Sequence, residues 1–150
     1  MRVRVGVFLA LLVAIVACTS GPDDAPSADH ARLVDDYIAA WNDYDGTAVR
    51  SMVTDDFEYV WFGRTVPVNE ITSYVADKES SNFSAETTDG PVWASDVVVE
   101  VAMVLRSDDG RPGPDGMDTV STLTIVEQGD DLLVARHEIR AEGTSSAVDE

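Results

Sequence analysis

Hydrophobic residues recur at helical spacing at the start of the domain. This repeat predicts a first helix that has Asp29 as its N-cap and ends at the Asp45-Gly46 pair. Two shorter helices are expected over Thr47–Val53 and Asn69–Glu79, the latter capped by its first residue. The hydrophobic face of the first helix consists of Leu33, Val34, Tyr37, Ile38, Trp41 and Tyr44.

The chain then changes to the two-residue period of β-strands. Inward and outward positions alternate from Phe57 to Phe62, and Gly63-Arg64 turns this strand back. Helices first and a β meander afterwards predict an α+β fold, with three N-terminal helices packed on one face of an antiparallel sheet. The later strands are expected at Phe83–Thr87, Val92–Leu105 with a bend near Ser95-Asp96, Thr119–Glu127 and Leu132–Ala141.

The N-terminal end has a third pattern, an uninterrupted apolar run from Val5 to Ala17. Arg2 and Arg4 precede it, and Cys18, the only cysteine, follows it. Such a basic start and apolar core are typical of a secretory signal. An uncleaved membrane anchor is the alternative, but thirteen apolar residues fall short of the ~20 that a spanning helix needs.

The end of this run, Ile15-Val16-Ala17-Cys18, resembles the bacterial lipoprotein box. The resemblance implies that residues 1–17 are a signal peptide and that the Cys18 thiol is lipidated. Residues 18–29 would then form the lipidated cysteine and a flexible tether, 30–142 the domain and 143–150 a flexible tail. We therefore expect a protein of the cell envelope, held to the membrane by its lipid and with its domain outside the cytoplasm.

Charge and composition exclude several kinds of partner. The formal net charge is −18, and removing residues 1–17 leaves eight basic against 28 acidic residues, a net charge of −20. A field of this sign repels phosphate backbones, so no nucleic acid is expected as a partner. Two histidines without a free thiol do not provide the ligands of a zinc site, and the sequence predicts no cofactor.

The stretch Tyr37–Gly63 (YIAAWNDYDGTAVRSMVTDDFEYVWFG) resembles the start of nuclear transport factor two-like, or SnoaL-like, domains. Val134–Glu138 resembles the last strand of that superfamily, which often carries a histidine. The resemblance implies that a curved sheet and the first helix enclose a cone-shaped pocket. The superfamily includes ketosteroid isomerases, SnoaL-like polyketide cyclases, dehydratases and domains that only bind.

The isomerase chemistry of that superfamily does not carry over to this chain. Tyr37 matches the oxyanion-hole tyrosine of the family. However, Trp61 stands where the family has its general-base aspartate, and the second oxyanion acid would fall near Thr122. Enolisation needs a positioned base and a neutral acid, so ketosteroid isomerisation is not expected. Asp55-Asp56 is assigned a turn or capping role, because neighbouring strand residues point to opposite faces.

The residues expected to face the cone are mostly aromatic. They describe either a pocket for a flat apolar ligand or an ordinary packed core. If Tyr37 lines a pocket, its hydroxyl needs no partner within the protein. Strand alternation places His137 on the same inward face as Leu133, Ala135 and Ile139. There it would act either as a proton shuttle or as a core histidine with its hydrogen bonds satisfied. The candidate pocket residues are Tyr37, Trp41, Phe57, Tyr59, Trp61, Trp93 and His137.

These observations favour a membrane-tethered lipoprotein whose cone domain binds a small apolar ligand or a protein partner, with no catalysis assigned. The alternative is a SnoaL-like cyclase, isomerase or dehydratase that uses His137 and Tyr37. A third class is an interaction module that forms a homodimer, because the superfamily often dimerises through the outer face of its sheet.

Overall fold

The computed structural model describes residues 26–108, 110 and 112–143. The expected signal peptide (1–17), the expected lipidation at Cys18, residues 18–25 of the expected tether and residues 144–150 of the expected tail lie outside the described residues. Within the described part, no helix is both long and apolar enough to cross a membrane.

The described chain begins with helices and ends with long strands, in the order that the sequence predicts. Two 3₁₀ turns, η2 (Val68–Glu70) and η3 (Asp77–Ser81), flank the third helix. The helices are α1 (Ala28–Asn42), α2 (Gly46–Ser51) and α3 (Ile71–Ala76), and the strands are β1 (Val53–Trp61), β2 (Arg64–Val66), β3 (Ser84–Thr87), β4 (Val92–Trp93), β5 (Val98–Arg106), β6 (Met117–Gln128) and β7 (Asp131–Ala141).

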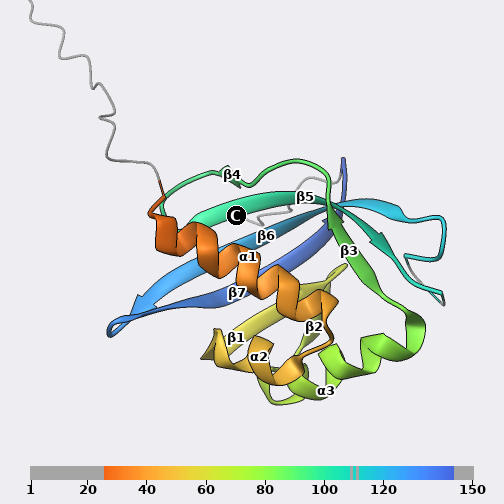
Figure 1. Ribbon diagram of the computed structural model, residues 1–150, viewed down its shortest axis with the longest axis horizontal. Helices are drawn as coiled ribbons and strands as arrows, with labels where there is room; N and C mark the ends of the chain where they lie inside the picture. Colours follow the sequence, from red (N-terminus) through yellow and green to blue (C-terminus); the bar gives the residue numbers. More distant parts are fainter. Residues whose placement is uncertain (1–25, 109, 111, 144–150) are drawn as a thin grey trace, which may run out of the picture.

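All the strands belong to one curved sheet. Its order is β2-β1-β7-β6-β5-β3, with β4 paired to β5. Strands β1 and β7 run parallel and every other pair is antiparallel. Helix α1 lies across the sheet, and α2 and α3 lie together near one end of it (Figure 1). The architecture is the expected α+β cone, in which the core fills the space between α1 and the concave face of the sheet.

The helix boundaries differ from the sequence-based expectation because other residues cap the helices. Ser27, rather than Asp29, caps α1 by accepting the His30 backbone N–H. The helix therefore begins before the expected domain boundary, and His30 lies in it. At the far end, Asp45 and Gly46 do not terminate α1, which ends at Asn42. Asp45 instead caps α2 and Gly46 is its first residue.

The third helical segment is shorter and less regular than expected. Asn69 does not cap it, because a 3₁₀ turn precedes α3 and another follows it. Ile71 and Val75 point into the core as their spacing predicts. Helices α2 and α3 touch closely, since a Cβ built on buried Gly46 would lie 2.0 Å from the Thr72 backbone oxygen.

Two local irregularities alter the expected strand faces. Asp55 and Asp56 lie inside β1 rather than at a turn or cap, and both are exposed because the pairing register shifts between Val53 and Glu58. The β6–β7 register also shifts, which leaves Ala135 without a partner in the ladder. Consequently Val134, and not Leu133 or Ala135, shares the buried face with His137 and Ile139.

The long expected strand at Val92–Leu105 is broken close to the predicted bend. It divides into β4 and β5, and the Ser95 hydroxyl accepts the backbone N–H groups of Val97 and Val98 in the connecting loop. Serine oxygens commonly organise such turns. This break lets the chain fold back so that β4 pairs with the beginning of β5.

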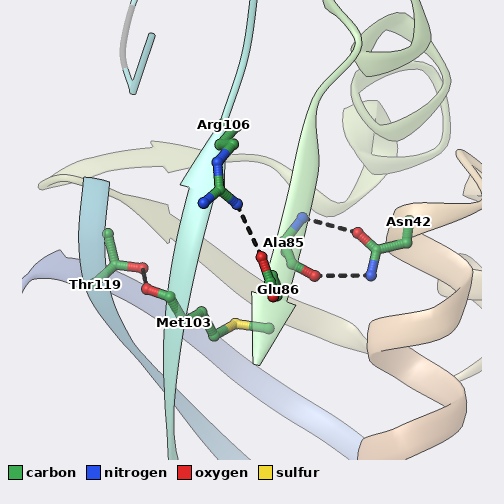
Figure 2. A network of polar contacts seen from close by, with 6 residues as sticks. All are labelled: Asn42, Ala85, Glu86, Met103, Arg106 and Thr119. Atoms are coloured by element: carbon green, nitrogen blue, oxygen red, sulfur yellow. Dashed lines mark hydrogen bonds and ion pairs between the residues drawn. The ribbon is translucent and has the colours of Figure 1, made fainter. Parts of the chain in front are cut away.

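Helix α1 is fastened to the edge of the sheet by its last residue. The Asn42 side chain donates from Nδ2 to the Ala85 carbonyl and accepts the Ala85 backbone N–H at Oδ1, both at 2.9 Å (Figure 2). On the two strands of that edge, Arg106 pairs with Glu86 at 3.0 Å, and the Thr119 hydroxyl of β6 donates to the Met103 carbonyl at 3.1 Å (Figure 2). Asn42 thus fixes the end of α1 against β3.

Candidate functional site

The interior of the cone is almost filled. A cavity of about 20 Å³ remains between α1 and the sheet, which is room for about one water molecule. Its walls are nearly all apolar, so any polar atom among them stands out. The lining residues are Tyr37, Ile38, Trp41, Tyr59, Phe83, Ala85, Met103, Leu105, Ser121, Leu123, His137 and Ile139.

Four of the seven predicted site residues line this cavity. Tyr37 and Trp41, one turn apart on α1, meet Tyr59 of β1 and His137 of β7 there. The rings pack against one another, with the His137 ring centroid 5.5 Å from that of Tyr37 and 5.1 Å from that of Tyr59. The structure therefore brings together residues 100 positions apart in the chain.

The other three predicted residues lie outside the cavity lining. Phe57 is buried in the core, although it does not border the free space. Trp61, at the end of β1, is half-buried and contacts the Phe62 and Phe83 rings. Trp93 lies in β4, where its ring meets the edge of His30. The bend before β5 and the position of Trp61 at the strand end account for this placement.

A chain of hydrogen bonds fixes His137 and determines its tautomer. The Ser121 hydroxyl donates to the Met103 sulfur at 3.2 Å, so its oxygen accepts from Nε2 of His137, also 3.2 Å away. With the proton on Nε2, Nδ1 is free to accept the Tyr37 hydroxyl at 3.1 Å. The expectation that the Tyr37 hydroxyl needs no protein partner is therefore wrong, since this donor is already used within the protein.

Burial keeps the titratable groups of the cavity neutral. Desolvation lowers the pKa of His137 to about 3. Desolvation also raises the pKa of the Tyr37 hydroxyl, against a smaller lowering by the nearby Trp41 side chain. It raises the pKa of Tyr59 as well, with a smaller contribution from the neighbouring tyrosines. A group in an apolar site resists the charged form. The lining contains no carboxylate, so an uncharged molecule suits these walls and a charged one does not.

Two hydrogen-bonding groups on the cavity walls have no partner among the described residues. They are the indole N–H of Trp41 and the hydroxyl of Tyr59, both fully buried. Their rings pack at a tilt of 34°, with the centroids 4.9 Å apart. Leaving a buried donor unpaired costs about 1–3 kcal/mol. Among the side-chain nitrogen and oxygen atoms of the described lining residues, these two groups alone are buried without a hydrogen-bond partner.

Ser121 is the site residue that sequence reasoning missed. It stands one position before Thr122, which points outward and lies 3.4 Å from the Arg140 guanidinium. The alternation of β6, with Thr119, Ser121 and Leu123 buried, places Ser121 inside. That two-residue period was the signal that could have found it. The described residues also contain no cluster of acidic, histidine or cysteine side chains that could hold a metal.

By sequence, the chain matches neither a family model nor a curated protein. Its fold is similar to solved structures. One is an NTF2-like protein with a cystatin-like fold from Novosphingobium aromaticivorans, with a TM-score of 0.62 and 12% identity over 79% of this chain and 83% of that one. These numbers show a shared fold and no more.

Two further similar structures carry the names of candidate enzymes. A candidate polyketide cyclase from Sinorhizobium meliloti has a TM-score of 0.59 and 19% identity, covering 73% of this chain and 94% of that one. A candidate scytalone dehydratase from Novosphingobium aromaticivorans has a TM-score of 0.55 and 14% identity, covering 75% and 81%. At these identities the likeness shows the fold alone.

Proposed function

We propose that the cone binds a small, uncharged, mainly apolar molecule that carries one hydrogen-bond acceptor, such as a ketone. The observation that carries this proposal is the pair of unpartnered donors, Trp41 Nε1–H and Tyr59 Oη–H, on otherwise apolar walls. A carbonyl oxygen has two lone pairs and can accept from both donors. No catalysis is assigned to the domain.

The small volume of the cavity implies that binding moves side chains. A ligand pocket usually holds about 300 Å³ or more, whereas this cavity offers about 20 Å³. Met103 lies in the wall, and its unbranched side chain adapts readily to irregular spaces. We propose that the Met103 side chain moves aside when the ligand binds, so that the filled cone is the unliganded state.

Cyclohexanone and methylenecyclohexane test this proposal, because the two molecules have nearly the same shape and only the ketone accepts hydrogen bonds. In the full-length Trp61→Phe/Trp93→Phe protein, Trp41 is the only tryptophan, so it is the source of the tryptophan fluorescence. We expect the ketone to change Trp41 fluorescence in a saturable way. Its dissociation constant should be about tenfold lower than that of the hydrocarbon.

Two variants make the same experiment specific to the cavity. Met103→Ala should bind the ketone more tightly, because it removes the side chain that must move. Tyr59→Phe should remove most of the preference for the ketone. Absence of saturable binding to both the parent and Met103→Ala would contradict the ligand proposal and leave the interaction module in its place.

The enzyme alternative rests on the Tyr37–His137 hydrogen bond. In that alternative His137 is the acid or base and Tyr37 the hydrogen-bond donor. A general base works best when its pKa lies near the working pH, and burial holds the pKa of His137 at about 3. The Tyr37 hydroxyl is also occupied by His137. We therefore place the enzyme second to a binding function.

We propose further that the domain is tethered to the cell envelope through lipidated Cys18. The proposal is supported by the apolar run that ends at this only cysteine. Cys18→Ser should abolish incorporation of radiolabelled palmitate and leave either an uncleaved precursor or soluble protein, measured by labelling and membrane fractionation. Retention of processed Cys18→Ser protein in the membrane fraction would contradict lipid anchoring.

A further inference from the structure

A single ammonium group lies among three aromatic rings next to the cone. Lys78, the only lysine of the chain, belongs to η3. Its Nζ lies 4.5 Å from the ring centroid of Tyr74, 4.9 Å from that of Trp61 and 5.4 Å from that of Phe83. We call these three rings the aromatic cage.

The cage is built from separate parts of the fold. Trp61 ends β1, Tyr74 lies on α3, and Phe83 follows η3. Phe83 is buried and also lines the cavity, whereas Trp61 and Tyr74 are half-buried. The cage therefore has a fixed floor and walls that reach the surface. Phe83 belongs to both the cage and the cavity lining, whereas Trp61 and Tyr74 belong to the cage alone.

Three aromatic rings around one point favour a cation that carries methyl groups over a bare ammonium. The faces of aromatic rings attract positive charge, and cages of such rings recognise quaternary ammonium groups. A lysine ammonium is compact and strongly hydrated, so the cage offers it little compared with water. A quaternary ammonium carries methyl groups that gain from burial against the rings. A net charge of −18 also enriches cations near the surface.

We propose that the aromatic cage is a binding site for a small organic cation of the quaternary ammonium or fully methylated amine class, and that Lys78 is its built-in occupant. The ligand cation takes the place of the Lys78 ammonium, which moves out into water. The site differs from the proposed ketone site, because it selects for positive charge and uses Trp61 and Tyr74, which do not line the cavity.

Choline and its neutral isostere 3,3-dimethylbutan-1-ol test the site in the full chain, held in maltoside micelles at constant ionic strength. Selective ¹³C-lysine labelling yields one set of side-chain signals, because Lys78 is the only lysine. We expect ring currents to shift the Lys78 Cε–Hε signal upfield. Choline should return this signal toward the position of free lysine in a saturable way, and the neutral isostere should not.

Matched variants separate a ligand site from a structural lysine. Removing the occupant in Lys78→Ala should tighten choline binding, followed by calorimetry, by about tenfold. Lys78→Arg keeps an occupant and should bind choline no more tightly than the wild type. Trp61→Leu should lose binding in the Lys78→Ala background, whereas Trp93→Leu, whose ring lies outside the cage, should keep it.

Three results would overturn the proposal. The first is a Lys78→Ala protein that melts cooperatively and does not bind choline, because Lys78 would then only fasten α3 and η3 to β1. The second is equal binding of choline and its neutral isostere. The third is choline binding that survives Trp61→Leu, which would show only general attraction to an acidic surface.

Discussion

Gly46→Ala should destabilise the domain by about 3 kcal/mol, near the upper end of the usual cost of overpacking a core. The new Cβ would lie 2.0 Å from the Thr72 carbonyl oxygen and 2.7 Å from its carbon. These are backbone atoms of α3, so no side-chain rotation relieves the clash and the two helices must move apart. Alanine favours a helix by up to about 1 kcal/mol over glycine, which is too little to compensate. Urea unfolding followed by circular dichroism measures the change.

Gly90→Ala is the matched control for this prediction. A Cβ at Gly90 meets no atom within 4 Å, and its backbone is not left-handed. The expected change is within about 0.5 kcal/mol, as for most surface substitutions. If Gly46→Ala were as stable as Gly90→Ala, the close contact between α2 and α3 would be wrong.

Between pH 7 and pH 5, the free energy of unfolding should fall by about 2 kcal/mol more in the wild type than in the His137→Gln variant. The pKa of His137 is about 3 in the folded protein, against an ordinary value of 6.5. Between these values the unfolded chain binds a proton that the folded protein excludes. Stability from the neutral histidine is therefore fully present above about pH 6.5 and is lost as the pH falls toward 3.

The other titrating groups are the same in the two proteins. A difference between their slopes of unfolding free energy against pH therefore reports His137 alone. His137→Gln loses packing and hydrogen bonds at all pH values, so its absolute stability is lower and is not the readout. The difference in unfolding free energy between the two proteins should narrow steadily from pH 7 to pH 5 in urea titrations. Parallel curves would show that His137 is solvated, and that the cavity is wetter than its walls indicate.

Much of the fold could be predicted from local periodicity. The helical repeat placed Val34, Tyr37 and Trp41 on the buried face of α1, and all three are buried. The boundaries were less predictable, because several residues near each end can cap a helix and tertiary packing selects one. Ser27 was selected over Asp29, and Asp45 serves the helix after the one it was expected to end.

The candidate site was predictable only where the strands are regular. His137 points inward as expected, although the unpaired residue Ala135 changes which neighbours share its face. A single extra residue in a ladder leaves no clear mark in a sequence. The size of the cavity depends on how side chains from α1, β5 and β7 interlock. No single segment contains that information, so the filled state of the cone could not be predicted.

The hydrogen bonds of Asn42 also cover part of a free edge of the sheet. A free strand edge is a template on which a second chain can add its own strand, the first step of many aggregates. On β3 the backbone N–H and carbonyl of Ala85 are bonded to Asn42, and just before the strand the Phe83 carbonyl accepts the Tyr44 hydroxyl at 2.7 Å. The opposite edge, β2, has only three residues. These two edges therefore offer a second copy of the chain little backbone to pair with, which disfavours aggregation by strand addition.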